Sequence, residues 1–349
     1  MKTSAPRIPV SIVTGFLGSG KTTVLTRLLA HPQMGRTAVL VNEFGEIGID
    51  DVLLRQVSAN VVLLDSGCIC CMIGDDLAAR LLELLAQREA RSIPPFERVI
   101  VETTGLADPA PLLQNFMAEP LAAAPLRMAA VVTTVDAVNG ARQLDEHVES
   151  VKQAAVADRL LITKTDLVEP AATASLVGRL QQLNPSAALH QIARGEIEPE
   201  LILDAGLWNA QAQRIDVERW LNARALTGRT STRHGAAFHA SHSSIPPRHE
   251  AIDTFSIRWE GPVRFEEFSD AIEKLVSRHG EGLLRIKGIL DVKDSGPVVV
   301  QGVQTAFYPP IRLASWPAGA DRASTLVFIT RNISRKLIES EFSLVAHKR

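Results

Sequence analysis

The stretch Gly15-Phe16-Leu17-Gly18-Ser19-Gly20-Lys21-Thr22 fits the phosphate-binding pattern G-x-x-x-x-G-K-[ST]. Residues 8–14 before it predict a buried strand, and the leucine spacing of residues 23–30 predicts a helix. Glycines let the backbone turn tightly, so that successive N–H groups face phosphate oxygens at the positive end of the helix. Lys21 is predicted to reach the β- and γ-phosphates, and the Thr22 hydroxyl to hold Mg²⁺. The predicted nucleotide-binding residues here are Gly15, Gly18, Ser19, Gly20, Lys21, Thr22 and Thr23.

The composition of the chain excludes several classes of protein. Its 349 residues suffice for two domains, and 46% hydrophobic with 22% charged residues is ordinary for a globular protein. The net charge of −2 gives no reason to expect binding to nucleic acid or to an anionic membrane. No apolar run reaches the ~18 residues of a spanning helix, and residues 1–7 lack the apolar core of a signal peptide. We therefore expect a cytoplasmic protein that binds neither nucleic acid nor membrane.

Strands and helices alternate along the first part of the chain. The predicted strands are 8–14, 37–41, 61–64, 98–101, 128–135, 159–162 and 188–192. The predicted helices are 23–30, 77–88, 141–157 and 173–183. Nearly continuous apolar strands are typical of a parallel sheet that is covered on both faces. This pattern predicts an α/β fold, a doubly wound P-loop NTPase domain over residues 1–223.

The composition changes after this domain. Residues 224–250 are rich in Ser, Thr, His, Arg and Pro and predict a flexible linker. Its four histidines are irregularly spaced, so a metal-collecting arm and a merely polar linker both stay open. Residues 251–349 predict a smaller C-terminal α+β domain, with strands at 254–259, 298–303 and 326–329 and helices at 264–278 and 334–342.

The motif Glu102-Thr103-Thr104-Gly105 follows an apolar strand, where P-loop proteins carry a carboxylate near Mg²⁺. Glu102 is predicted to orient a water bound to Mg²⁺, and the Gly105 amide to contact the γ-phosphate. An acidic strand end in solvent is the alternative interpretation. The candidate catalytic residues are thus Lys21, Thr22 and Glu102, and the candidate Mg²⁺ ligands are Thr22 and Glu102.

The motif Thr163-Lys164-Thr165-Asp166 follows a later strand, where P-loop GTPases carry Asn-Lys-x-Asp. In that position the Asp carboxylate accepts from guanine N1–H and the amino group, and the Lys stem packs over the ring. Adenine lacks this pair of donors. Thr163, Lys164 and Asp166 are therefore predicted to bind guanine; an Asp that only caps a helix is the alternative.

All three cysteines lie within four residues, at Cys68, Cys70 and Cys71. An odd number this close together cannot build a disulfide framework, whereas thiolates at this spacing suit Zn²⁺ or Co²⁺. A closed structural site needs about four protein ligands, so we expect an open site or one completed by another loop. Glu43 is the candidate additional ligand. Small buried cysteines without a metal are the alternative.

The sequence resembles the CobW family of metallochaperone GTPases, kin to the nickel-insertion GTPases of urease and hydrogenase maturation. It carries, in order, the P-loop, Asn42-Glu43-Phe44-Gly45, Gly67-Cys68-Ile69-Cys70-Cys71, Glu102-Thr103-Thr104-Gly105-Leu106-Ala107-Asp108-Pro109 and Thr163-Lys164-Thr165-Asp166. The second domain is similar to the family's C-terminal domain at 284–288, 301–303 and 324–329. The chain departs from the family pattern in Thr163, where Asn is usual, in Ser66, where Asn often stands, and in lacking a dense histidine tract.

The resemblance implies a GTPase that binds metal at the Cys-x-Cys-Cys motif and hands it to a client metalloprotein or cofactor-biosynthesis enzyme. The implied ligands are GTP, Mg²⁺ and either Zn²⁺ or Co²⁺, and a nucleotide-dependent oligomer is compatible with this interpretation. No residue stands out as a catalytic base, so we expect slow intrinsic turnover. Two other classes stay open: a P-loop ATPase or kinase, and a non-enzymatic, nucleotide-gated metal buffer or sensor. Residues 163–166 argue against the first, and Lys21, Thr22 and Glu102 against the second.

Overall fold

The computed structural model describes residues 7–41, 61–65, 75–117, 121, 124–203, 252–316 and 322–342. Contacts between Cα atoms divide these residues into two compact units, one holding 7–178 and 188–203 and the other 179–187 and 252–342. The predicted linker at 224–250 lies outside the described residues, so its bounds stay predictions.

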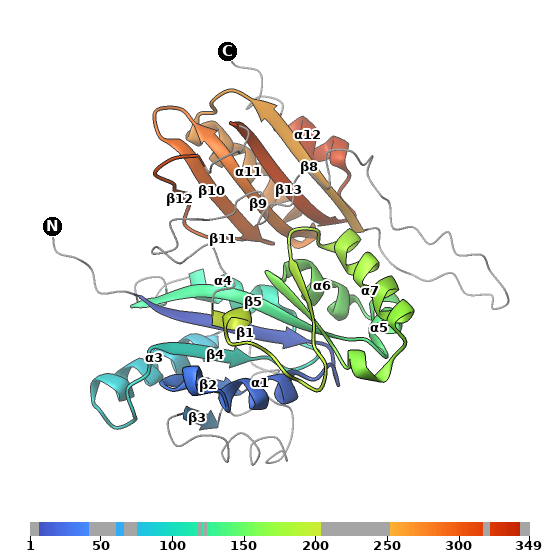
Figure 1. Cartoon of the computed structure of the whole chain (residues 1–349). Helices are drawn as coiled ribbons and strands as arrows, with labels where there is room; N and C mark the ends of the chain where they lie inside the picture. The colour runs from blue at the N-terminus through green and yellow to red at the C-terminus, as the bar shows by residue number, and fades with distance from the viewer. Residues whose placement is uncertain are drawn as a thin grey trace. The chain divides into compact units, whose positions relative to one another are not determined.

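The first unit is built on a seven-stranded parallel sheet with the order β3-β2-β4-β1-β5-β6-β7 (Figure 1). Its strands are β1 Ile8–Gly15, β2 Thr37–Val41, β3 Val61–Asp65, β4 Arg98–Glu102, β5 Leu126–Asp136, β6 Arg159–Thr163 and β7 Ala188–Gln191. The predicted doubly wound α/β fold is confirmed, and every predicted strand is present. Since all seven strands run parallel, the loops at their carboxyl ends meet at one edge of the sheet.

Helices cover both faces of this sheet because its strands are apolar on both sides. The helices are α1 Lys21–Leu29, α3 Asp75–Glu89, α4 Pro109–Met117, α5 Gly140–Glu146, α6 Val148–Val156, α7 Pro170–Leu183 and α8 Glu200–Leu203. On one face, α1 and α8 pack against Val13 of β1 and Val132 of β5. The next residue of β5, Thr133, projects to the opposite face, where its hydroxyl donates to the carbonyl of Gln153 in α6.

One predicted helix is wrong in its extent. We predicted a single helix at 141–157, but the structure has two, α5 and α6, separated by His147 in an extended conformation. No Gly or Pro stands at this break, so local sequence does not explain it. Instead the His147 ring stacks on Phe16 of the P-loop, with ring centroids 4.5 Å apart. This tertiary contact accompanies the interruption of the helix.

The second unit is an antiparallel sheet with two helices on one face. Its elements are β8 Ile252–Glu260, α11 Phe265–His279, β9 Leu283–Val292, β10 Gly296–Val303, β11 Ala306–Phe307, β12 Ile311–Arg312, β13 Ala323–Arg331 and α12 Arg335–Glu341. The strand order is β11-β10-β9-β13-β8, and β12 pairs with β10. Phe268 and Leu275 of α11 pack with Phe328 of β13 in one apolar core. The predicted α+β domain is confirmed, although the central strand β9 was not predicted.

Among the residues that the structure describes, no helix is both long and apolar enough to cross a membrane.

Candidate functional site

The P-loop links the end of β1 to the start of α1 through a tight turn. Gly18 and Gly20 have φ angles of 70° and 88°, in the left-handed region that favours glycine. Gly20 is also the residue before the first turn of α1. Because it carries no side chain, it leaves the first N–H groups of the helix uncovered by its own atoms. The loop therefore offers backbone donors and the positive end of a helix to an anion.

Lys21 places a positive charge inside this loop. Its ammonium nitrogen donates to the carbonyl of Gly15 at 2.9 Å and to that of Phe16 at 3.3 Å. The side chain is 9% exposed, so little water screens the charge. A phosphate chain in the loop would meet this ammonium group, as the sequence predicted for Lys21.

Thr22 and Glu102 lie together although they are 80 residues apart in sequence. The Thr22 hydroxyl donates to Glu102 Oε1 at 3.0 Å, and Glu102 ends β4 next to Val13 of β1. Glu102 is 4% exposed. A hydroxyl and a carboxylate beside a phosphate loop are the hard oxygen donors that Mg²⁺ prefers. The two side chains thus fit the metal that was predicted for them.

The loop after β4 lies directly against the P-loop. Thr103 donates its N–H to the carbonyl of Val13 at 3.0 Å and its hydroxyl to Thr14 Oγ1 at 2.8 Å. At Gly105, a Cβ would lie 2.6 Å from Leu17 N and 2.7 Å from Leu17 Cα, closer than real Cβ contacts. Only glycine fits this approach, which brings the backbone of residue 105 beside the phosphate-binding turn.

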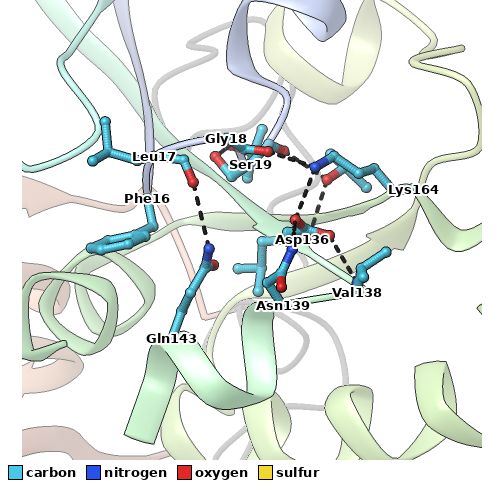
Figure 2. Close-up of polar contacts among 12 residues, drawn as sticks. Phe16, Leu17, Gly18, Ser19, Asp136, Val138, Asn139, Gln143 and Lys164 are labelled. Carbon is cyan, nitrogen blue, oxygen red and sulfur yellow. Dashed lines mark hydrogen bonds and ion pairs between the residues drawn. The ribbon is translucent and has the colours of Figure 1, made fainter. Parts of the chain in front are cut away.

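Two consecutive residues at the end of β6 also donate hydrogen bonds to the P-loop. The Thr163 hydroxyl donates to the carbonyl of Ser19 at 2.7 Å. Lys164, in the left-handed conformation, donates to the carbonyl of Gly18 at 2.7 Å and to Asp136 Oδ2 at 2.9 Å (Figure 2). Thr163, which stands where the family usually has Asn, therefore still connects this strand end to the P-loop.

Asp166 lies at the exposed end of the same segment, in the 3₁₀ turn Thr165–Leu167. Its Oδ1 accepts from the N–H of Arg194 at 3.1 Å, so the loop after β7 borders it. The Thr165 hydroxyl also donates to the carbonyl of Ile192 at 3.2 Å. The sequence did not single out residues 192–194 for the site. They lie at the end of a predicted strand and directly after it, and this position was the signal that could have identified them.

Asp136 is the main residue of the site that sequence reasoning missed. It ends β5, is 1% exposed, and accepts from Lys164 Nζ at 2.9 Å, Asn139 Nδ2 at 3.0 Å and Val138 N at 2.8 Å. Figure 2 shows these donors around its carboxylate. Burial acts to raise the pKa of Asp136, but the hydrogen bonds from Lys164, Asn139 and Val138 and the charge of Lys164 outweigh it, so that the pKa is lowered. An acidic residue directly after a predicted apolar strand, as at Glu102, was the available signal.

The predicted transition-metal ligands cannot be placed with the other site residues. Cys68, Cys70, Cys71 and Glu43 all lie outside the described residues. Within the described ranges, no group of three His, Cys, Asp or Glu side chains comes together in a way that could hold a metal ion. The metal site therefore stays a prediction. The P-loop, Glu102, Gly105, Thr163 and Lys164 are, by contrast, brought together at one sheet edge.

Comparison with known proteins agrees with this architecture. The CobW/HypB/UreG nucleotide-binding domain matches residues 9–191, and the cobalamin synthesis protein CobW C-terminal domain matches residues 252–345. The chain is 30% identical to the zinc chaperone YjiA of Escherichia coli over 341 residues, 96% of this chain and 98% of that one. It is 31% identical to the zinc chaperone CobW of Pseudomonas aeruginosa, over 98% of this chain and 92% of that one.

A solved structure shows the same fold over nearly the whole chain. The crystal structure of Zn(II)-bound YjiA GTPase from E. coli matches with a TM-score of 0.69 at 26% identity, covering 97% of this chain and 99% of that one. The two domain matches place a nucleotide-binding domain before a C-terminal domain, and the two relatives and this structure match nearly the whole chain. The chain therefore belongs to the CobW/HypB/UreG family of nucleotide-binding proteins, in the form that carries a CobW C-terminal domain.

Proposed function

We propose that this chain hydrolyses GTP to GDP and phosphate, and uses that cycle to bind zinc and deliver it to a client metalloprotein or cofactor-biosynthesis enzyme. The observation that carries the nucleotide part is the 3.0 Å contact of Thr22 with the buried Glu102, beside the Lys21 ammonium group in the P-loop. This set provides a cation for the phosphates and two oxygen ligands for Mg²⁺.

Each residue of the set has a separate task in this proposal. Lys21 and the N–H groups at the start of α1 bind the β- and γ-phosphates. Thr22 and Glu102 hold Mg²⁺, which supplies positive charge where negative charge develops on the transferred phosphoryl group. Because no residue of the sequence stands out as a catalytic base, we propose slow intrinsic hydrolysis.

Guanine selection is assigned to Thr163, Lys164 and Asp166. Thr163 and Lys164 contact the P-loop carbonyls of Ser19 and Gly18, so that their segment borders any nucleotide in the loop. Asp166 is exposed and retains Oδ2 to accept from a base, while Oδ1 accepts from Arg194 N. An anionic acceptor selects guanine, which offers two N–H donors, over adenine.

The metal part of the proposal rests on the sequence and the family. Two relatives that cover nearly the whole chain are named zinc chaperones, and the matched crystal structure holds Zn(II). The proposed ligands are Cys68, Cys70 and Cys71, with Glu43 as a further ligand from the loop after β2. Since β2 and β3 end at the same sheet edge as β1, a γ-phosphate that orders the loop after β2 would favour a closed metal site.

The experiment measures metal affinity in two nucleotide states. Zn²⁺ and Co²⁺ are titrated against a chromophoric chelator, with a non-hydrolysable GTP analogue plus Mg²⁺ or with GDP. We expect tighter binding with the GTP analogue, by about 1–3 kcal/mol, because coupling between two sites is reciprocal. Co²⁺–thiolate absorbance reports sulfur ligation. Cys70→Ser combined with Cys71→Ser is expected to remove the tight site and leave nucleotide binding intact.

Metal delivery, GTP hydrolysis and guanine selection can each be contradicted by a different result. Equal metal affinity in the two nucleotide states would overturn coupled delivery. Absence of phosphate release from GTP would favour a metal buffer or sensor, and equal binding of ATP and GTP would favour a P-loop ATPase or kinase.

A further inference from the structure

Helix α6 contacts the loop after β4 through a buried glutamine. Gln153 is 0% exposed, and its Nε2 donates to the carbonyl of Gly105 at 3.1 Å and to that of Ala107 at 3.0 Å. One amide group therefore holds two peptide units of the loop that carries Gly105. Because a peptide unit is planar and trans, the Leu106 N–H points away from Gln153 when the Gly105 carbonyl points towards it.

The adjacent residue of α6 makes a second contact with the same loop. Lys152 Nζ lies 2.6 Å from Asp108 Oδ2, and both side chains are partly buried, at 18% and 27% exposure. The other oxygen of Asp108 accepts from the N–H of Ala110 at 3.0 Å, at the start of α4. Lys152 and Gln153 thus hold the loop at its end and at its middle.

The opposite side of the loop is closed by the P-loop. Gly105 lies so close to Leu17 that a Cβ there would be 2.6 Å from Leu17 N. Gln153 itself is fixed to the sheet, because its carbonyl accepts from the Thr133 hydroxyl at 2.8 Å. Residues 105–107 are therefore held between the sheet-bound helix α6 and the phosphate-binding turn. Any shift of Gln153 changes where the Gly105 backbone stands relative to the phosphates.

We propose that Lys152 and Gln153 are positioning residues that hold the Gly105 loop in the conformation that binds the γ-phosphate, and so set the preference for GTP over GDP. This inference rests on the proposed function, in which the site binds and hydrolyses GTP. Among the described residues, neither side chain forms a hydrogen bond or an ion pair with the P-loop. Their side-chain hydrogen bonds reach the loop that carries Gly105, so we expect the main effect on interactions that GTP makes and GDP does not.

The test compares nucleotide affinities of Gln153→Leu and Lys152→Met with those of the unaltered chain. We expect each variant to lose affinity for a non-hydrolysable GTP analogue plus Mg²⁺ by about fivefold or more, the lower range for coupled sites, while GDP affinity stays unchanged. The kcat for GTP should fall in both. Lys152→Arg, which keeps the charge that pairs with Asp108, should restore the affinity and kcat of the unaltered chain.

Val156→Ala is the matched control for stability. Val156 is a buried apolar residue of the same helix, so its truncation lowers the unfolding temperature without removing a side-chain hydrogen bond or ion pair to the loop. It should leave the ratio of GTP to GDP affinity unchanged. The inference would be overturned if Gln153→Leu and Lys152→Met left the ratio of GTP to GDP affinity unchanged, whether both affinities fell equally or neither fell. Failure of the unaltered chain to bind or hydrolyse GTP would instead overturn the proposed function and the inference with it.

Discussion

The ammonium nitrogen of Lys164 lies 2.9 Å from Oδ2 of Asp136, at the adjacent ends of two neighbouring strands. Asp136 is buried, whereas the Lys164 side chain is 35% exposed and also reaches the Gly18 carbonyl. The pair joins the P-loop, the end of β5 and the segment after β6. A buried carboxylate that is not itself part of a sequence motif therefore orients the lysine assigned to the base.

Asp136→Asn is expected to lower the free energy of unfolding by about 1–2 kcal/mol, because the ion pair with Lys164 is lost. This value is at the low end for hydrogen bonds to a charged group, since water reaches the Lys164 ammonium group and screens the pair. Guanine-nucleotide affinity should fall as well, since Lys164 loses its fixed position. Chemical denaturation and nucleotide titration measure the two effects. Asp166→Asn serves as the control for stability, because Asp166 is exposed, and unchanged nucleotide affinity in Asp136→Asn would contradict the positioning role.

The pKa of Asp136 also predicts a pH dependence. Its folded-state pKa is lowered from the ordinary 3.8, so its stabilising contribution is fully present above that value and is lost as the pH falls through the lower, folded pKa. The difference in unfolding free energy between the unaltered chain and Asp136→Asn should therefore be constant from about pH 7 to about pH 5 and shrink only below the ordinary pKa. A difference that shrinks already near neutral pH would contradict the assignment.

Thr163→Val should weaken GTP and GDP binding alike. The substitution keeps the shape of the side chain but removes the hydroxyl that donates to the Ser19 carbonyl at 2.7 Å, at a cost of about 0.5–1.5 kcal/mol. The P-loop holds the phosphates that both nucleotides share, so the two affinities should change together. Thr163→Ser should restore them. If only the discrimination between GTP and ATP changed, Thr163 would act in base recognition alone, and its hydrogen bond to Ser19 would not support phosphate binding.

Asp166→Asn should reduce the preference for guanine by about 1–3 kcal/mol, because a neutral amide replaces an anionic acceptor. Competition of GTP, ATP and xanthosine triphosphate against a fluorescent nucleotide measures the preference in both proteins. The variant should gain affinity for xanthosine triphosphate relative to GTP. Equal affinity of the unaltered chain for ATP and GTP would show that residues 163–166 do not select the base.

Lys21→Ala is expected to abolish GTP hydrolysis and weaken GTP binding, because a charge-assisted contact to the phosphates is lost. The ammonium group also bonds the carbonyls of Gly15 and Phe16, so the variant's unfolding temperature must be compared with that of the unaltered chain. Phosphate release is the measurement. If a folded Lys21→Ala protein released phosphate as fast as the unaltered chain, the assignment of residues 15–22 as the phosphate-binding loop would be wrong.

The local sequence alone determined the strands of the first unit and the phosphate-binding turn. Apolar runs such as the one in β5 and the spacing of glycines in the P-loop are properties of neighbouring residues, so they are readable without a fold. The meeting of Thr22 with Glu102 could also be predicted. Glu102 ends one parallel strand and Thr22 follows the loop after another, and the carboxyl ends of parallel strands share one edge.

Strand β9 shows where local patterns fail. Arg285 and Lys287 of this strand are each 1% exposed, although alternating charged residues usually indicate a face in water. Arg285 donates to Gln301 Oε1 on the neighbouring strand β10 at 3.3 Å. Burial of these charges is a property of the tertiary structure, which no window of sequence contains.

The tertiary structure alone decided the break of the helix at His147, the role of Asp136 and the contact of Gln153 with the Gly105 loop. Each involves a partner from another element: Phe16 for His147, Lys164 for Asp136, and Gly105 for Gln153. The energy of such a contact exists only once the sheet has placed both partners at the same edge. Sequence therefore determines which chemical groups this protein carries to its phosphate-binding edge, and packing decides which of them are held against one another.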